Sequence, residues 1–72
     1  MAVYHYVNEK HAFAKVVVSG DRVEEVGPKD LTFFVARPEE EMQVYAKVRP
    51  GGPSRLVESG KVGKLASRVR LI

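Results

Sequence analysis

The sequence predicts an all-β fold, a small antiparallel barrel or tight sandwich of about five to seven short strands. Two observations support this prediction. Apolar and β-branched residues alternate with polar ones over short stretches, and turn-forming residues separate these stretches about every eight to twelve positions. No segment has a strong helical spacing of apolar residues. The alternative is an α+β fold with a helix around 38–48 or near the C-terminus.

Length and composition limit the class of protein. A chain of 72 residues makes one small domain, 1–72, which buries only about 60% of its unfolded surface. Cysteine is absent, which excludes disulfides and thiolate zinc sites, and no cofactor is expected. No apolar run reaches the roughly 20 residues that span a bilayer, and no signal-peptide core is visible. We therefore expect a cytoplasmic protein without membrane contact. The near absence of amide side chains is typical of thermophilic proteins.

The first half of the chain contains four predicted strands. The segments Ala2–Val7 and 11–18 are rich in aromatic and β-branched residues, and the second ends in three consecutive valines, which favour extended backbone. A Ser-Gly-Asp turn leads to a weaker strand at Arg22–Val26. A Gly-Pro-Lys-Asp break then leads to a strong strand at Leu31–Ala36.

The segment 38–48 fits two structures. Pro38 followed by three glutamates is a favourable start for a helix, because proline suits the first helical position and carboxylates suit the positive helix end. From 42 to 48, however, apolar and polar residues alternate without a miss, and at 3.6 residues per turn the same apolar set makes no stripe. We therefore predict a strand here. The predicted core includes Val16, Val18, Val35, Val44, Ala46 and Val48.

The last third is less regular. Two prolines and two glycines make 49–53 a loop. Either Ser54 caps a short helix that reaches Glu58, or 55–58 is a strand that turns at 59–61. Further on, apolar residues have helical spacing from Val62 to Ile72, but 68–71 alternates as a closing strand does. The strand interpretation is preferred for this part of the chain.

Charge is divided along the chain. Residues 1–46 carry five basic and eight acidic groups, a net charge of −3, whereas residues 47–72 carry seven basic groups against Glu58 alone, a net charge of +6. The total of +3 therefore conceals a strongly basic C-terminal third. Such asymmetry indicates an anionic partner and says nothing about the fold.

No motif for catalysis or metal binding is present. The glycines at 51–52 and 60–63 lack the strand-to-helix context of a phosphate-binding loop, and no serine sits in a G-x-S-x-G elbow. His5 and His11 flank Glu9, but their spacing matches no metal-binding motif. Ordinary surface histidines and a non-enzymatic protein are the expectation.

The sequence predicts nucleic-acid binding by the basic C-terminal third. If 42–48 buries its apolar row, Tyr45 points outward between an amide and two cations. An exposed tyrosine in such a position stacks a base, which contributes roughly 1–3 kcal/mol, while nearby cations bind phosphates. The predicted contacts with DNA or RNA are Tyr45, Lys47, Arg49, Arg55, Lys61, Lys64, Arg68 and Arg70.

The alternative function is protein assembly. The basic third also suits an acidic protein surface, including the acidic half of a second copy, and exposed sheet edges allow pairing between chains. In this interpretation the protein is a homo-oligomer or a subunit of a complex. Size in solution without nucleic acid separates the two functions, because a monomer favours nucleic-acid binding.

Overall fold

The computed structural model describes residues 1–49 and 51–70. Strands make up 58% and helix 6% of it, which confirms the predicted all-β fold. The strands are β1 (Ala2–Val7), β2 (Phe13–Val18), β3 (Arg22–Val26), β4 (Leu31–Ala36), β5 (Glu41–Lys47), β6 (Ser54–Lys61) and β7 (Ser67–Arg68), and the helix α1 (Val62–Leu65) precedes β7. Within these residues no helix is both long and apolar enough to cross a membrane.

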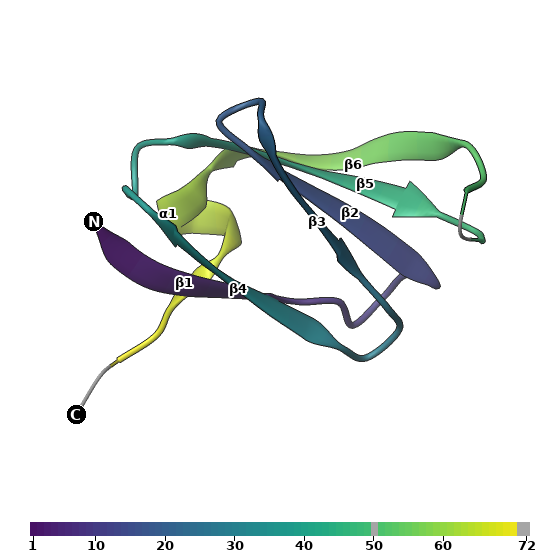
Figure 1. Cartoon of the computed structure of the whole chain (residues 1–72), viewed down its shortest axis with the longest axis horizontal. Coiled ribbons are helices and arrows are strands. Elements are labelled where there is room, and N and C mark those ends of the chain that lie inside the picture. Colours follow the sequence, from purple (N-terminus) through teal and green to yellow (C-terminus); the bar gives the residue numbers. More distant parts are fainter. Residues whose placement is uncertain (50, 71–72) are drawn as a thin grey trace.

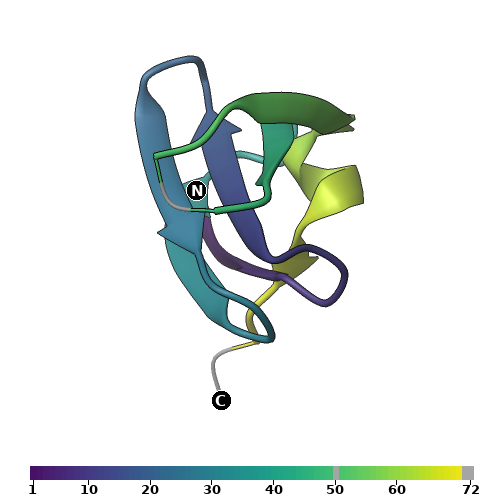
Figure 2. The same ribbon diagram turned by 90° about the vertical axis from the view of Figure 1, so that its right-hand side faces the viewer.

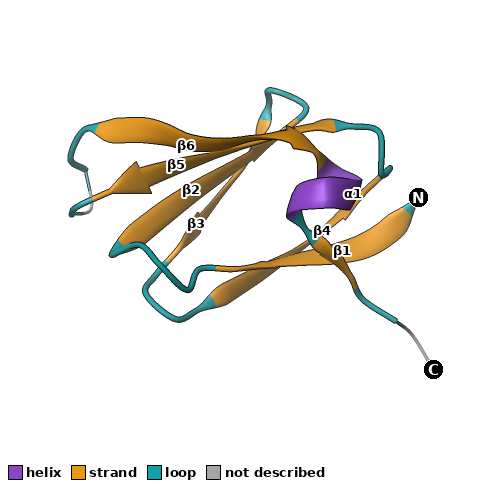
Figure 3. Ribbon diagram, turned by 180° about the vertical axis from the view of Figure 1, so that it is seen from behind, coloured by secondary structure: helices purple, strands orange, loops and turns teal. Residues whose placement is uncertain are grey.

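The strands form two antiparallel sheets, ordered β4-β1-β7 and β3-β2-β5-β6. Figure 1 shows β1 and β4 beneath β2, β5 and β6, and Figure 2 brings the β5–β6 connection nearest the viewer. This connection and α1 lie at opposite ends of the long axis, as Figures 1 and 3 both show. The two ends of the molecule therefore carry different parts of the basic C-terminal third.

The alternating rows of β2 and β5 build the core as predicted. The register pairs Val16 with Val44 and Val18 with Met42, and all four side chains are buried. Directly opposed residues of an antiparallel pair share a face, so these side chains form one apolar layer. The helix alternative around 38–48 is wrong, because the alternation of β5 suits only a strand with one buried face.

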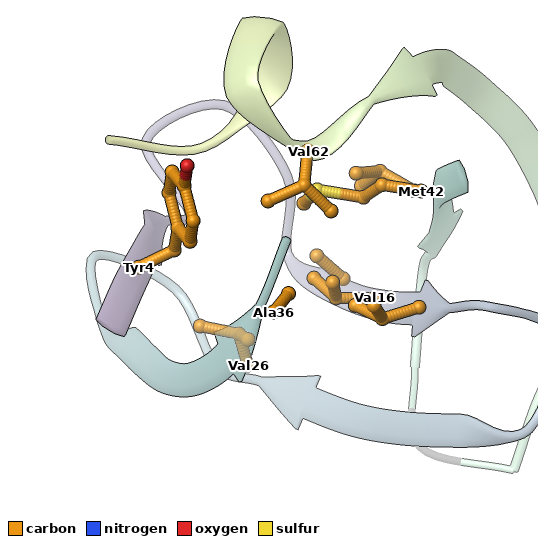
Figure 4. Packing of buried hydrophobic residues seen from close by; sticks show 9 residues of the cluster. Tyr4, Val16, Val26, Ala36, Met42 and Val62 are labelled. Carbon is orange, nitrogen blue, oxygen red and sulfur yellow. The ribbon is translucent and has the colours of Figure 1, made fainter. Parts of the chain in front are cut away.

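The three-stranded sheet and α1 close the core from the other side. Figure 4 shows Tyr4, Ala36 and Val62 directed toward the buried row of the four-stranded sheet. The Tyr4 ring also stacks on Phe34, with centroids 6.2 Å apart. Burial of a valine-sized or larger apolar side chain contributes about 1.5–3 kcal/mol, so this small cluster supplies most of the hydrophobic stabilisation.

Two predicted core residues are instead at the surface. Val35 alternates with Phe34 and Ala36, which are the residues that β4 turns inward, so Val35 faces solvent. Val48 is 85% exposed, because β5 ends at Lys47 and the chain leaves the sheet there. The prediction for both residues was therefore wrong, while Ala46 is half-buried at the margin of the core.

The C-terminal third contains strand, helix and strand in turn. The chain continues as β6 to Lys61, so the predicted turn at 59–61 is wrong and the short helix from Ser54 does not form. The single turn α1 is anchored to the β4–β5 connection, where Gly63 donates its N–H to the Pro38 carbonyl at 3.0 Å. A Cβ at Gly63 would come within 3.1 Å of Pro38, so glycine allows this close approach without displacing the proline.

The closing strand is shorter than predicted. β7 pairs with β1 at Tyr4 and His5 only, and Val69 then donates its N–H to the Val3 carbonyl at 2.8 Å. The predicted strand 68–71 and the helical spacing to Ile72 extend beyond residue 70, and Leu71 and Ile72 lie outside the described residues, as does Pro50 of the predicted loop 49–53.

Glu40 fastens the β2–β3 turn to the β4–β5 connection. Its carboxylate accepts hydrogen bonds from Ser19 Oγ at 2.5 Å, from Arg22 at 2.6 Å and from the Arg37 N–H at 2.6 Å. These donors, the Ser19 hydroxyl foremost, hold the pKa of Glu40 below its ordinary value. Arg22 also donates to the Val35 carbonyl at the free edge of β4, and so connects the two sheets.

Candidate nucleic-acid interface

A buried amide positions the loop between β1 and β2. Asn8 is fully buried, and its Nδ2 lies 3.0 to 3.1 Å from the carbonyl oxygens of His11, Val26 and Gly27. Its Oδ1 accepts a hydrogen bond from the His11 N–H at 3.1 Å. Buried carbonyls need partners, so Asn8 fixes the loop that carries Lys10 and His11.

This loop and the β5–β6 hairpin enclose a groove of about 440 Å³. Three cationic residues line it: Lys10 from the loop, Lys47 from the end of β5 and Arg55 from the start of β6. Its apolar lining comes from Ala12, Ala46, Val48 and Pro53. None of the described residues that line the groove is acidic. The groove therefore combines cationic and apolar lining residues.

The hairpin loop brings a further cation to the same end of the molecule. The Gly52 N–H donates to the Arg49 carbonyl at 3.1 Å, and Arg49 is exposed. A Cβ on Gly52 would lie 3.0 Å from Arg49 Cγ, so glycine leaves room for the arginine side chain. Lys47, Arg49 and Arg55 therefore all belong to the hairpin.

One of these cations already has a partner. Lys47 Nζ lies 2.9 Å from Glu25 Oε1, and only 13% of the Lys47 side chain is exposed. The hydrogen bond from Lys47, reinforced by its charge, lowers the pKa of Glu25. Lys47 therefore offers less charge to a ligand than Lys10 or Arg55, both of which are exposed.

Tyr45 lies outside the groove. It points to the outer face of the four-stranded sheet, opposite Lys15 and Leu56 in the register, so the predicted strand orientation is right. Its side chain is half-buried, and Lys15 Nζ lies 5.8 Å from the ring centroid. A base would have to share this ring with the Lys15 ammonium.

The other predicted contacts belong to the opposite end. Lys61 Nζ lies 2.5 Å from Glu41 Oε1 at the end of β6, next to α1, which carries the exposed Lys64. Arg68 and Arg70 follow α1 in the chain and are exposed. The fold therefore divides the basic third into one group at the hairpin and one group in and around α1 (Figure 3).

Sequence reasoning missed Lys10, because it lies in the acidic half of the chain and only the fold brings it to the hairpin. Sequence reasoning also missed Asn8. The one feature that could have pointed to it is that the chain contains few amide side chains. Neither histidine has a metal-binding environment: His5 packs against Phe33 with ring centroids 6.0 Å apart, and His11 contacts Asn8. Among the described residues no three His, Cys, Asp or Glu side chains form a group suited to a metal ion.

A smaller hollow of about 180 Å³ borders the same loop. It is lined by Tyr6, Glu9 and Glu58, and it shares Lys10 and His11 with the hairpin groove. Burial, and then the negative charges of Glu58 and Glu9, raise the pKa of Tyr6. Lys10 therefore has two carboxylates on one side and the hairpin groove on the other.

Comparison with family models, with curated proteins and with solved structures found no match for this chain. A functional assignment for the domain therefore depends on the groove and on the charges around it.

Proposed function

We propose that this domain binds nucleic acid without catalysing a reaction, with the sugar-phosphate backbone in the groove beside the β5–β6 hairpin. The groove itself supports this proposal: exposed Lys10 and Arg55 line it, and none of its described lining residues is acidic. Each phosphate that such a cation neutralises releases condensed counterions, which gives affinity that is independent of sequence and falls with salt.

The apolar lining favours single strands over duplex. Ala46, Val48 and Pro53 offer apolar contacts to a sugar or to an unstacked base, whereas a duplex keeps its bases inside the helix. The volume of about 440 Å³ is at the lower end of the range of small-ligand sites, about 300–1,000 Å³. The groove therefore accommodates about one nucleotide, and we expect Arg49, which is exposed in the adjoining hairpin loop, to contact a neighbouring phosphate.

Fluorescence anisotropy with mixed-sequence oligonucleotides over a salt series tests the proposal. The Lys10→Gln, Arg55→Gln double variant should bind more weakly and should lose roughly 1.4 from the logarithmic salt slope on single strands, about 0.7 per lost contact. The matched control is Lys29→Gln, Arg37→Gln, which removes the same charge from exposed positions outside the groove. Equal slopes for the two variants, or no binding by the parent at low salt, would refute the proposal.

The alternative function, self-assembly through sheet edges, receives little support from the edge strands of the four-stranded sheet. On β3, Arg22, Glu24 and Glu25 are exposed, and charges on an edge strand discourage pairing. On β6 the register shifts by a bulge opposite Val44 and Tyr45, which twists an edge away from a partner. We expect sedimentation of the protein alone to show a monomer, and a defined oligomer would favour assembly instead.

A further inference from the structure

The outer face of the β4-β1-β7 sheet is apolar. The register pairs Val35 with Val3, Phe33 with His5 and Leu31 with Val7. Of these, Leu31 is 42% exposed, Phe33 58% and Val35 47%. We call these six residues the apolar face: Val3, His5, Val7, Leu31, Phe33 and Val35.

Both faces of β4 are largely apolar, and this distinguishes β4 from an ordinary surface strand. Thr32 pairs with Tyr6 on the inner side and is half-buried, whereas Leu31 and Phe33 point to solvent. The outer face of the other sheet is different, because it carries charged residues such as Lys15 and Glu41. Single exposed apolar residues are normal, but a contiguous patch in which five of six side chains are apolar and only His5 is ionisable marks an interaction site.

A groove of about 920 Å³ continues from the apolar face. It shares Val3 and Val35 with that face and extends to Val69, and its polar side carries Arg68 and Arg70. Neither arginine forms an ion pair with any residue that the structure describes. None of the described lining residues is acidic. The register sets Arg68 opposite Tyr4 on β7, the edge strand of this sheet. A ligand that covers both features therefore meets the apolar side chains on the face and the two guanidinium groups where the sheet ends.

We propose that the apolar face and this groove bind a peptide segment of a partner protein in which a row of apolar residues is followed by carboxylates. Phenylalanine and arginine are enriched at protein interfaces, and charges are depleted from their centres, as they are here. The guanidinium groups pair with carboxylates in bidentate geometry. Nucleic acid fits less well, because the face is mainly aliphatic and its one exposed aromatic ring already contacts His5.

The dimensions of the face set the length of the segment. The row from Leu31 to Val35 spans about 13 Å at the usual rise of 3.3 Å per residue. It therefore takes about four or five extended residues, or about two turns of helix, before the acidic end reaches Arg68 and Arg70. This surface is separate from the hairpin groove, so the inference does not depend on nucleic-acid binding.

Selection of random 12-residue peptides displayed on phage, with the purified full chain as bait, tests the proposal. Parallel selections use Phe33→Gln and the matched control Leu56→Gln, which removes a side chain of 50% exposure from the other sheet. Peptides with at least two apolar residues and a net negative charge should be enriched on the parent and on Leu56→Gln, and not on Phe33→Gln. Leu31→Gln serves as a second variant if Phe33→Gln does not fold, as judged by circular dichroism.

The most enriched peptide, made synthetically, is then titrated against Arg68→Gln, Arg70→Gln by anisotropy. Affinity should fall at least tenfold and should lose most of its salt dependence, because two charge-assisted pairs are removed. Failure to enrich any peptide, enrichment of basic peptides, or enrichment that persists on the face variants would overturn the proposal. A dimer of the parent that Phe33→Gln converts to a monomer would also overturn it, because a second copy would then cover the face.

Discussion

Asn8 Nδ2 lies 3.1 Å from the carbonyl oxygen of Val26. This contact joins the end of β1 to the end of β3, which are 18 positions apart in sequence. The backbone continues the same junction, because the Asn8 N–H donates to the Asp30 carbonyl at 2.8 Å and the Lys29 N–H to the Asn8 carbonyl at 2.9 Å. One short side chain therefore sets the loop that lines the candidate groove.

Replacement of Asn8 by Ala should lower the free energy of unfolding by about 3 kcal/mol, because buried backbone acceptors left without a donor cost about 1–3 kcal/mol each. Urea denaturation followed by circular dichroism measures this change. Gln43→Ala is the control, since the other amide is only half-buried on the outer face of β5, and it should cost less than about 1 kcal/mol. Equal losses for the two variants would mean that the Asn8 network contributes little.

The carboxylate of Glu40 should make the free energy of unfolding depend on pH. Its pKa is lowered in the folded state, so the ionised form stabilises the fold at pH values above its ordinary pKa of 4.5. This stabilisation is lost as pH falls through the lower, folded-state pKa. Glu40→Gln should therefore be less stable than the parent at pH 7, and the two unfolding curves should converge in acid. A difference that stays constant from pH 7 to pH 2 would contradict the prediction.

Removal of the Glu25 carboxylate should strengthen nucleic-acid binding. Glu25→Gln removes the charge that pairs with Lys47 at 2.9 Å, so the ammonium becomes available to a phosphate. We expect higher affinity at low salt and a salt slope on single strands that is steeper by roughly 0.7. Glu24→Gln is the matched control, because Glu24 is also exposed on β3. The same gain in both variants would show only a general effect of net charge.

Tyr45→Ala tests whether the Tyr45 ring stacks on a nucleic-acid base or only packs on the outer face of the sheet. Because Lys15 lies over the half-buried ring, we expect a stability loss of about 1–2 kcal/mol, made up of lost apolar burial and the lost cation–π contact. Oligonucleotide affinity should change by less than about threefold, below the 1–3 kcal/mol of a stacked base. A larger loss of affinity, with Tyr45→Phe close to the parent, would place nucleic acid on the outer face of β5.

The core assignment has a direct test in two valines. Val62 is fully buried, so Val62→Ala should cost about 2 kcal/mol through lost burial and the cavity left behind. Val48→Ala should change stability by less than about 0.5 kcal/mol, as surface substitutions do. Thermal unfolding of the two variants measures the difference, and similar melting temperatures would contradict this division between core and surface.

The alternation of residues was sufficient to predict the first five strands and one buried layer. From Met42 to Ala46 only one set of alternate positions is apolar, so the face that turns inward is fixed by composition. β4 gives no such signal, because Leu31, Phe33, Phe34 and Val35 make both of its faces apolar. Its orientation is decided by pairing with β1, which turns Ala36 inward and leaves Val35 exposed.

The charge division was also visible in the sequence, but its arrangement in space was not. Residues 47–72 are basic as a group, yet β6 runs the length of the sheet and carries the cations after Lys61 to the end opposite Arg55 (Figure 1). Lys10 and Asn8 join the hairpin groove through contacts between positions distant in sequence. Local pattern determines which segments are strands, because that depends on neighbouring residues. Tertiary structure alone decides which charges share a site, because that depends on how the strands pair.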